Sequence, residues 1–409
     1  MNFLYNAAIS LYAAAAKTAA LKNHKAKLMT QGQKRTLSIL EQKRGDGEYV
    51  WIHASSLGEF EQGRPLIEMI HRNRPELKIL LTFFSPSGYE VRKNFSGADI
   101  ICYLPFDRPR TVERFLDLAK PTMAIFVKYE FWGNYLNSLK RRGIPTYIIS
   151  SIFRPGQAFF RPWGGSFRKM LRCFTHLFVQ DDASRQLLAG IGIDNVTVAG
   201  DTRFDRVTDI LAARKQLPII ENFTSTGNLT LIIGSSWQPD EDIIIPYFNA
   251  HPELKLIIAP HEFNDDRIQA LINRIERKTA RYTQISENDV AGFDCLIIDC
   301  FGILSSCYRY ADIAYIGGGF GAGIHNVNEA AVYGIPVIFG PNHSKFREAI
   351  ELKECGGGFS ITCKEDFNAI ADRLTTDTQS LTQSGQAAGA YIQSHLGATK
   401  LIFSHIFSE

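Results

Sequence analysis

Short apolar runs alternate with helical patterns along most of this chain. The first series of runs covers residues 49–54, 78–84, 100–104, 122–128, 144–150, 177–180 and 196–199. The second series covers residues 229–233, 254–259, 295–298, 313–316 and 336–339. Between the runs, as from Glu59 to His71, apolar residues recur with the period of a helix. Short apolar strands that alternate with helices predict parallel sheets covered on both faces.

A stretch without this rhythm separates the two series. Residues 206–228 contain Leu217-Pro218 and Ser225-Thr226-Gly227-Asn228, and we interpret them as an interdomain crossing. The predicted fold class is therefore α/β, with two Rossmann-like doubly wound parallel-sheet domains facing a cleft. The predicted segments are an N-terminal helix with a basic arm (1–40), a first domain (41–205), the crossing (206–228) and a second domain (229–409). Ligands of open α/β sheets bind beyond the carboxyl ends of the strands, so residues that directly follow strands are the candidates for function.

The composition excludes several classes of protein. Hydrophobic residues make up 45% of the 409 residues, which supports large cores and argues against a disordered chain. The seven cysteines are scattered without a CxxC pair, and no histidine spacing suggests zinc. We expect a reduced, cytoplasmic protein without a metal site. The net charge is +3, and the body of the chain lacks the basic surplus of a nucleic-acid-binding protein.

The N-terminal arm is apolar first and basic afterwards. Residues 3–16 have a helical pattern, with one apolar face formed by Leu4, Ala8, Leu11, Tyr12 and Ala15. Before Glu41 there is no acidic residue, and the six positive charges are Lys17, Lys22, Lys25, Lys27, Lys34 and Arg35. The helix is short for a membrane span, and a signal peptide would carry its charges before the apolar core. The pattern fits an interfacial anchor on an anionic leaflet, or an alanine-rich helix packed on the body.

A glycine cluster follows the apolar run 313–316. A helical pattern begins at Asn326, and the next strand ends at Gly340-Pro341. Glycines let a backbone approach a ligand, and a helix N-terminus offers N–H groups to an anion. Asn326 and Glu329 are expected in the first helical turn, where a carboxylate can accept hydrogen bonds from a sugar diol. The alternatives are a relaxed dinucleotide fingerprint, which belongs after the first strand of a domain, or a glycine-rich turn with a capping Asn.

Two candidate motifs follow strands of the first domain. In the segment 53–61, Gly58 permits a tight turn and Glu59 falls at a helix N-terminus, whose dipole favours the ionised carboxylate. A carboxylate there can act as a general base on a hydroxyl, or it is an ordinary acidic residue at a helix start. After the fourth strand, Lys128 and Glu130 form either a local ion pair or a cation for an acidic ligand and a second carboxylate that supports the base.

Two further motifs bind anions in one interpretation and have structural roles in the other. Ser235 or Ser236 can hydrogen-bond a phosphate, and Pro239 with Asp240 suits a helix start. The alternative is an ordinary helix cap. In the segment 200–205, Arg203 offers a forked donor to a phosphate or carboxylate, or it forms a surface salt bridge.

Together these motifs resemble one family, the 3-deoxy-D-manno-octulosonic acid (Kdo) transferases of lipopolysaccharide synthesis, which have the two-Rossmann GT-B glycosyltransferase fold. The segment 53–59 is similar to the family's His-Ala-x-Ser-x-Gly-Glu, and 200–205 to its Gly-Asn-x-Lys-Phe-Asp. The segments 103–107 and 130–132 resemble Tyr-x-Pro-x-Asp and Glu-Leu-Trp. Gly318-Gly319 with His325-Asn326-x-x-Glu329 looks like the donor-site Gly-Gly…His-Asn-x-x-Glu.

The chain departs from the family pattern at three places. Pro260-His261-Glu262 stands where the family usually has Pro-Arg-His, and Ala330 stands where a proline usually follows the glutamate. Residues 151–161 align only loosely with the family's Asn-x-Arg region. These departures indicate a divergent branch in which acceptor details differ.

The resemblance implies an enzyme that transfers Kdo from CMP-Kdo to a lipid A precursor of the lipid IVA type, with inversion and without a cofactor or metal. It assigns 41–205 to the acceptor and 229–409 to the nucleotide-sugar donor. It places the enzyme at the cytoplasmic face of the inner membrane, peripheral or anchored by the N-terminal helix, with no nucleic-acid partner. Glu59 would be the general base and Glu130 a second catalytic carboxylate. The implied substrate-binding residues are Ser56, Gly58, Lys128, Arg203, Ser235, Ser236, His261, Gly318, Gly319, Asn326 and Glu329.

Two other functions share this architecture. A sugar-nucleotide 2-epimerase would need neither a membrane arm nor a lipid acceptor. A non-catalytic, membrane-bound nucleotide-sugar binding module would not need Glu59.

Overall fold

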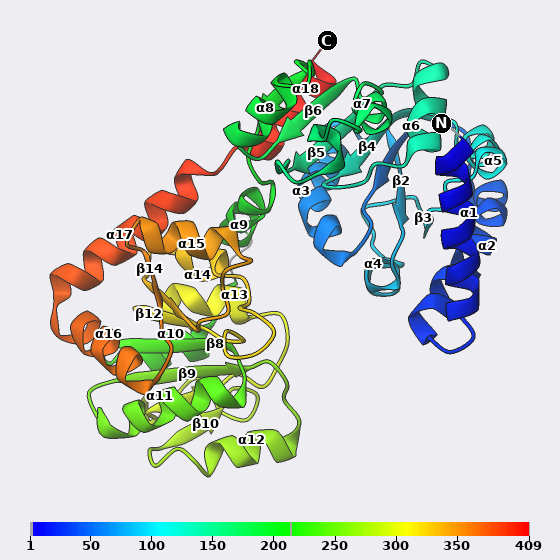
Figure 1. Ribbon diagram of the computed structural model, residues 1–409. Coiled ribbons are helices and arrows are strands. Elements are labelled where there is room, and N and C mark those ends of the chain that lie inside the picture. The colour runs from blue at the N-terminus through cyan, green and yellow to red at the C-terminus, as the bar shows by residue number, and fades with distance from the viewer. Residues whose placement is uncertain (1–2, 213–214, 409) are drawn as a thin grey trace. The chain divides into compact units, whose positions relative to one another are not determined.

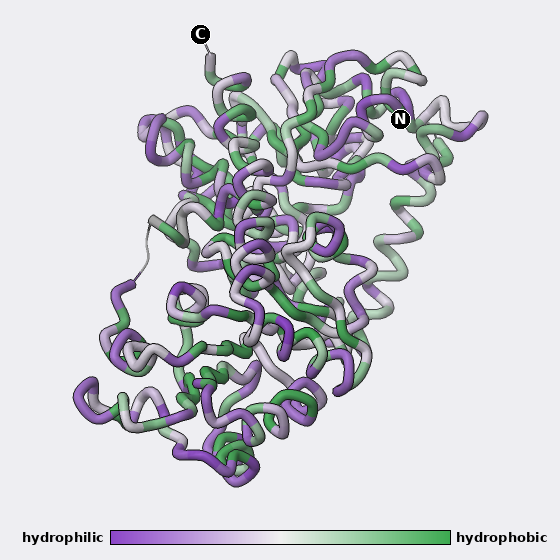
Figure 2. Tube along the Cα trace, turned by 90° about the vertical axis from the view of Figure 1, so that its left-hand side faces the viewer, coloured by the Kyte–Doolittle hydropathy of each residue, from purple (hydrophilic) through white to green (hydrophobic). Residues whose placement is uncertain are grey.

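A computed structural model describes residues 3–212 and 215–408, which form two compact units (Figure 1). Unit 1 contains the chain up to Asp205 together with the segment from Gly397 onward, and unit 2 is Arg206–Leu396. The predicted arm, crossing and second domain each include positions outside the described residues, namely 1–2, 213–214 and 409. Figure 2 shows hydrophobic positions concentrated inside the units and hydrophilic positions along loops and outer helices.

Unit 1 is built on a seven-stranded parallel sheet with the order β3-β2-β1-β4-β5-β6-β7. Its strands are β1 (Tyr49–His53), β2 (Lys78–Phe83), β3 (Ile100–Tyr103), β4 (Pro121–Val127), β5 (Thr146–Ser151), β6 (His176–Val179) and β7 (Val196–Val198). Its helices are α1 (Phe3–Ala19), α2 (His24–Lys43), α3 (Leu57–Asn73), α4 (Pro86–Arg92), α5 (Pro109–Ala119), α6 (Gly133–Arg141), α7 (Gly165–Leu171), α8 (Asp182–Ala189) and α18 (Ala398–Phe407). The chain leaves this unit through α9 (Arg203–Ala212).

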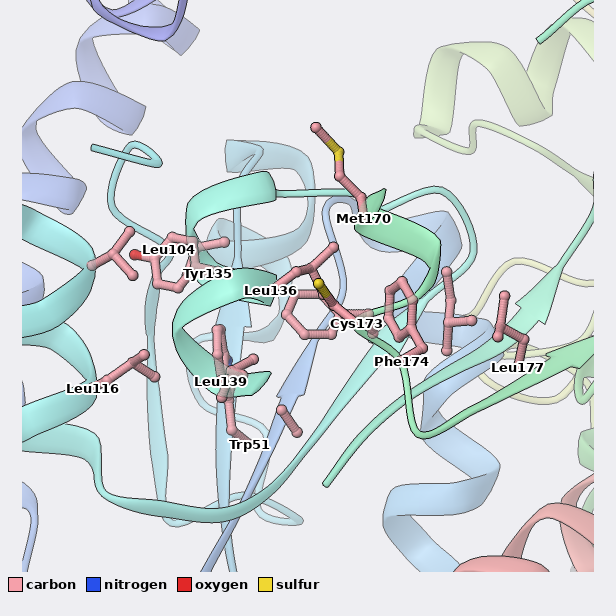
Figure 3. Close-up of a cluster of buried hydrophobic side chains, with 14 of the residues drawn as sticks. Trp51, Leu104, Leu116, Tyr135, Leu136, Leu139, Met170, Cys173, Phe174 and Leu177 are labelled. Atoms are coloured by element: carbon pink, nitrogen blue, oxygen red, sulfur yellow. The ribbon is translucent and has the colours of Figure 1, made fainter. Parts of the chain in front are cut away.

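Both faces of this sheet are buried, as the continuous apolar runs predict. On one face Trp51 packs against Phe115 and Phe126, with ring centroids 5.1 and 5.2 Å apart. Figure 3 shows Trp51 in this core cluster together with Leu136 and Leu139. On the other face Val50 and Ile52 belong to a separate core cluster. Burial on both faces fixes the register of β1, so the residues at its carboxyl end have defined positions.

Unit 2 is built on a second seven-stranded parallel sheet, with the order β10-β11-β9-β8-β12-β13-β14. Its strands are β8 (Thr230–Ser236), β9 (Lys255–Pro260), β10 (Thr279–Arg281), β11 (Cys295–Ile297), β12 (Ile313–Ile316), β13 (Val337–Phe339) and β14 (Gly358–Ser360). Its helices are α10 (Pro218–Thr224), α11 (Gln238–Ala250), α12 (Asp265–Ile272), α13 (Leu304–Cys307), α14 (Asn328–Ala331), α15 (Arg347–Glu354), α16 (Lys364–Thr376) and α17 (Thr378–Ser394).

The predicted α/β class with two parallel sheets is confirmed, and each predicted run coincides with a strand to within a few residues. The sequence did not predict β10 and β14, the edge strands of unit 2, because each has only three residues and no apolar run. The predicted crossing contains helical residues. Its Leu217-Pro218 pair begins α10, because a proline in the first turn is compatible with a helix.

The C-terminal segment differs from the expected second domain, since α18 lies in unit 1. Ile402 and Ile406 join the core cluster that contains Phe60. The Asp205 carboxylate accepts hydrogen bonds from the backbone N–H groups of Gly397 and Thr399, at 2.6 and 2.5 Å. A carboxylate at a helix N-terminus satisfies unpaired N–H groups there and is stabilised by the helix dipole.

The helix α1 docks on unit 1 through one face. The Tyr5 hydroxyl donates to the Asp107 carboxylate at 2.6 Å, and Ala13 and Ala16 are buried. Most of the predicted apolar face is exposed, with Leu4 and Leu11 75% and 73% exposed, whereas Tyr12 of the same face packs on Phe84 and Phe106. The arm is therefore both packed on the body and apolar on its outer side. None of the described helices is long and apolar enough to cross a membrane.

Candidate functional site

The Glu59 carboxylate is held at the N-terminus of α3 by the turn that follows β1. Ser56 is the N-cap, and its backbone N–H donates to Glu59 Oε2 at 3.0 Å. The Ser56 hydroxyl donates to the same oxygen, in addition to the capping box that Ser56 and Glu59 form at this helix start. Gly58 is exposed in the first turn, and Glu59 is partly exposed. The carboxylate lies at a helix start, as predicted. Both hydrogen bonds from Ser56 go to Oε2, so this one oxygen serves the structural role of holding the start of α3.

Glu130 is bound to His53, which the sequence motif contained without a role. The Glu130 Oε2 atom lies 3.0 Å from His53 Nε2 and accepts a hydrogen bond of 2.6 Å from Trp132 Nε1. Of the two alternatives for this pair, the local ion pair with Lys128 is not what holds Glu130, because its contact is with the His53 imidazole. Burial acts against the charge on Glu130, but the hydrogen bonds from His53 and Trp132 outweigh it and lower the pKa of this carboxyl.

A chain of buried hydrogen bonds supports His53 from behind. The Thr82 hydroxyl lies 2.9 Å from His53 Nδ1 and accepts a hydrogen bond of 2.8 Å from Trp51 Nε1. His53 Nδ1 also lies 3.1 Å from the Thr82 carbonyl oxygen, so Thr82 contacts this nitrogen through both its side chain and its backbone. These polar partners lie on β1 and β2, and apolar periodicity gave no signal for Thr82.

The two carboxylates are brought to the same turn by consecutive serines. Ser56 binds Glu59, while a hydrogen bond from Ser55 contributes to the lowered pKa of Glu130. The turn is fixed further because Phe84 and Ser85, after β2, donate backbone hydrogen bonds to the Ser55 carbonyl. The carboxyl ends of β1, β2 and β4 therefore converge on one small polar region.

Lys128 directly follows β4 in a left-handed backbone conformation, with φ of 68°. Its ammonium group lies 5.6 Å from the centre of the Tyr129 ring. Ser150 and Ser235 also have positive φ, of 53° and 54°, at the ends of β5 and β8. Such a conformation is costly for residues other than glycine, and it occurs preferentially at ligand sites.

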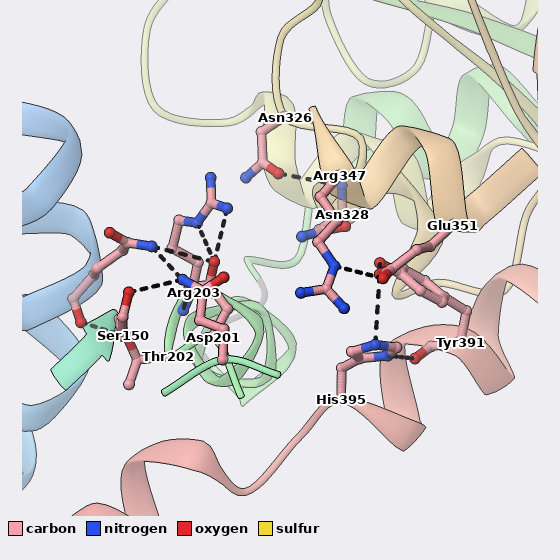
Figure 4. A network of polar contacts seen from close by, with 12 residues as sticks. Ser150, Asp201, Thr202, Arg203, Asn326, Asn328, Arg347, Glu351, Tyr391 and His395 are labelled. Carbon is pink, nitrogen blue, oxygen red and sulfur yellow. Dashed lines mark hydrogen bonds and ion pairs between the residues drawn. The ribbon is translucent and has the colours of Figure 1, made fainter. Parts of the chain in front are cut away.

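Arg203 is engaged by a neighbouring carboxylate (Figure 4). Its Nε and one terminal nitrogen donate to Asp201 Oδ2 at 2.9 and 2.7 Å. The Gln62 amide of α3 also donates to Asp201, and the Thr202 hydroxyl lies 2.9 Å from that of Ser150. The segment 200–205 thus ties α9 and α3 to the sheet, which corresponds to the salt-bridge alternative for Arg203.

In unit 2 the two serines after β8 have different surroundings. Ser236 is buried, and its hydroxyl donates to Glu241 Oε1 at 2.8 Å. Glu241 is itself buried and paired with Arg267 at 2.6 Å. The Ser236 hydroxyl is therefore part of a structural network, whereas Ser235 is partly exposed. As predicted, α11 begins at this point with Pro239 in its first turn.

The glycine cluster after β12 allows close contact between backbone segments. A Cβ on Gly317 would lie 2.3 Å from the Ser235 carbonyl oxygen, and one on Gly319 would lie 2.6 Å from Gly340. Gly318 has φ of 90°, and its N–H donates to Asp240 Oδ2 at 3.0 Å. We expected the Gly318 N–H to donate to a ligand. This expectation is wrong, because the buried Asp240 carboxylate of α11 already accepts this hydrogen bond. Asp240 also accepts from the Tyr315 hydroxyl at 2.8 Å.

Asn326 and Glu329 lie together after the glycine cluster. The Asn326 amide donates to Glu329 Oε1 at 3.1 Å, and its oxygen accepts from the Asn328 N–H at 3.2 Å (Figure 4). Glu329 is in the first turn of α14, but Asn326 precedes this helix, because its side chain bonds the first helical N–H. Glu329 also lies close to Tyr308, whose ring packs directly on Gly234.

His261 is exposed after β9 and stacks on two rings that follow neighbouring strands. Its ring centroid is 4.5 Å from that of Trp237 and 4.6 Å from that of His325. The sequence gave Trp237 no role, and it gave His325 only a place in a motif. Each of these rings follows a central strand of the sheet, and this shared position in the sequence could have predicted that they lie together.

The comparisons with known proteins agree with this arrangement. Residues 24–206 match the family model described as 3-deoxy-D-manno-octulosonic-acid transferase (kdotransferase). The 3-deoxy-D-manno-octulosonic acid transferase of Haemophilus influenzae is 25% identical over 362 residues, covering 85% of this chain and 84% of the relative. The transferase of the same name from Aquifex aeolicus is 29% identical over 323 residues, covering 76% and 82%.

Solved structures show the same fold at low sequence identity. MurG from Acinetobacter baumannii matches with a TM-score of 0.56 at 14% identity, covering 88% of this chain and all of that one. A putative UDP-N-acetylglucosamine 2-epimerase from Listeria monocytogenes matches with a TM-score of 0.55 at 14% identity, covering 89% and 98%. These likenesses establish the GT-B-like architecture of two parallel sheets. Together with the relatives, they lead to one conclusion: the chain is a glycosyltransferase that is similar, over most of its length, to the 3-deoxy-D-manno-octulosonic acid transferases.

Proposed function

We propose that this glycosyltransferase moves Kdo from CMP-Kdo to a lipid A precursor of the lipid IVA type, with inversion at the anomeric carbon. The observation that carries the proposal is the Glu59 carboxylate, fixed by Ser56 at the start of α3 beside the Glu130–His53 pair. The relatives share this name for their activity, and the chain spans more than four fifths of their length.

Glu59 is the general base of the proposed reaction. Its carboxylate takes the proton of the acceptor hydroxyl, and that oxygen forms a bond to the anomeric carbon of Kdo. The bond from this carbon to the CMP phosphate breaks, and the electron pair leaves with CMP. Because the capping box uses Oε2, we assign the proton to Oε1. Glu130 and His53 hold the turn that carries Ser55 and Ser56, so Glu130 acts as a positioning residue.

The residues of unit 2 bind the donor in this proposal. The departing phosphate gains negative charge, and we assign Ser235 and the Gly319 N–H to it, since Gly318 and Ser236 already have carboxylate partners. Glu329 accepts hydrogen bonds from the ribose hydroxyls, and Asn326 orients it. Lys128 of unit 1 is our candidate for the Kdo carboxylate, because Asp201 already engages Arg203.

The N-terminal arm provides the contact with the membrane in the same proposal. The outer face of α1 exposes Phe3, Leu4 and Leu11, and α1 itself is fixed to unit 1 through Tyr5. Basic residues follow without an acidic neighbour up to Glu41. A lipid acceptor requires the enzyme to work at a bilayer, and an exposed apolar helix with a basic flank binds anionic interfaces.

The function is tested by product analysis with the purified full chain. CMP-Kdo and a detergent-dispersed lipid A precursor are incubated with the enzyme, and the product is examined by NMR. We expect a new glycosidic bond whose anomeric configuration is opposite to that of the donor. A product with retained configuration would contradict the single displacement. Epimerisation of a nucleotide sugar without any transfer would favour the 2-epimerase alternative.

A further inference from the structure

Three aromatic rings meet at the carboxyl edge of the sheet in unit 2. Trp237 follows β8, His261 follows β9 and His325 lies in the loop after β12. These strands are neighbours in the order β9-β8-β12, so their loops converge. No step of the proposed reaction uses Trp237 or His325.

The rings form an ordered stack rather than a random contact. His261 stacks on Trp237 and on His325, with an interplanar angle of 27° in each case. Trp237 Nε1 lies 3.5 Å from His325 Nε2 and donates to it. The 3.5 Å contact between Trp237 and His325 is too short for the His261 ring to lie between them, so His261 stacks on both from the same side. Trp237 and His325 therefore make a flat surface, and the His261 ring lies on it.

The flat surface is neutral. Trp237 Nε1–H can donate only when His325 Nε2 carries no proton. Burial and the adjacent His261 lower the pKa of His325, which keeps this ring uncharged at neutral pH. Trp237 is 39% exposed, and His261, whose ring covers the surface on its outer side, is exposed.

The surface is joined to the glycine cluster. The His325 N–H donates to the Gly317 carbonyl at 3.1 Å, and a Cβ on Gly318 would lie 3.2 Å from the His325 ring. A nucleotide whose phosphate lies at the glycine cluster would have its base within reach of the stack.

We propose that Trp237, His261 and His325 form a stacking platform for the base of the donor nucleotide, with the base lying parallel to these rings. This inference rests on the proposed function, which supplies the nucleotide. Stacking acts on the face of a base and hardly distinguishes one base from another. The platform therefore contributes affinity for CMP, and the choice of cytosine is made by other groups.

The platform is tested by CMP titrations of the full chain with two measurements, calorimetry and tryptophan fluorescence. We expect Trp237→Ala to weaken CMP binding by roughly 5- to 150-fold, the range for the loss of one base-stacking contact. Trp237→Phe should retain most of the affinity, because it keeps a flat ring. CMP should quench the fluorescence of the parent and fail to quench that of Trp237→Phe.

A matched control is Phe301→Ala, which removes an aromatic ring that is 84% exposed in the same unit and packs at a tilt against Phe263 instead. Its CMP affinity should equal that of the parent. The platform is wrong if Trp237→Ala binds CMP like the parent, if CMP binds without quenching, or if Phe301→Ala loses as much affinity as Trp237→Ala. If CMP fails to bind the folded parent, both the platform and the proposed donor are wrong. Normal binding by Trp237→Ala would remove only the platform.

Discussion

At the scale of single residues, the donor site depends on the Glu329 carboxylate. We predict that Glu329→Ala weakens CMP binding by about 10- to 100-fold, because hydrogen bonds to a charged group contribute roughly 1.5–3 kcal/mol. Acceptor binding should change little. Calorimetry with CMP measures the effect, with Glu354→Ala, an exposed glutamate at the end of α15, as the control. Unchanged CMP affinity would leave Glu329 with its role at the start of α14 alone.

The identity of the cation for the Kdo carboxylate is also decided at single residues. We predict that Lys128→Gln raises the KM for CMP-Kdo at least several-fold, because the neutral amide loses the charge that attracts a carboxylate. Lys120→Gln is a matched control, because Lys120 also has positive φ and lies at the opposite end of β4. By contrast, Arg203→Gln should chiefly lower the thermal stability, since it breaks the contact with Asp201. A raised KM for Arg203→Gln with an unaffected Lys128→Gln would reverse the assignment.

At the scale of elements, the arm should dock the enzyme on anionic membranes. Each basic residue near an anionic surface contributes about 1 kcal/mol, and salt screens this attraction. We predict that replacing Lys17, Lys22, Lys25 and Lys27 with Gln reduces co-sedimentation with anionic liposomes and makes the remaining binding less sensitive to salt. Activity on a detergent-dispersed acceptor should largely survive, because Glu59 and Glu329 lie outside the arm.

The control for the arm replaces four exposed lysines elsewhere, Lys120, Lys140, Lys364 and Lys400, with Gln. This variant has the same net charge, and we expect it to bind liposomes almost like the parent. Equal liposome binding by the arm variant and the parent at low salt would show that the arm is only a helix packed on unit 1.

A second element, α18, should make the protein sensitive to acid. The His405 ring of α18 packs against the His176 ring of β6 with centroids 4.1 Å apart, and burial together with His405 lowers the pKa of His176 to about 4. The unfolded chain takes up a proton at His176 below about pH 6.5, but the folded chain does so only near pH 4, so stability falls as the pH decreases through this range. We predict that His405→Phe, which keeps an aromatic ring against Phe178, loses less stability than the parent between pH 7 and pH 5. Thermal melting at both pH values measures this, and equal losses would contradict it.

At the scale of the whole molecule, the sequence predicted the two sheets because burial on both faces produces continuous apolar runs. The edge strands β10 and β14 escaped detection since a short strand at a sheet edge needs no such run. Membership of α18 in unit 1 was equally hidden, because it depends on contacts such as that of Ile402 with the core around Phe60, and Ile402 comes more than 200 residues after that unit's last strand.

The candidate site was predictable where a motif and a strand end coincide, as at Glu59 and Glu329. It was not predictable where the partner comes from a distant segment. His53 rather than Lys128 binds Glu130, and Asp240 takes the Gly318 N–H. Only the register of neighbouring parallel strands brings these pairs together, and the register is absent from a linear pattern.

The central claim is that Glu59 drives the transfer of Kdo, and one comparison tests it most directly. Parent, Glu59→Gln and Glu68→Gln are incubated with CMP-Kdo and a lipid A precursor, and the mass gain of the acceptor is followed over time by mass spectrometry. The glutamine retains the hydrogen bond to the Ser56 N–H, so the cap of α3 survives while the base is lost. We predict that Glu59→Gln is slower by about 10²–10⁴, and that Glu68→Gln, on the same helix, keeps the rate of the parent. Near-normal transfer by Glu59→Gln, or no mass gain with the folded parent, would contradict the account.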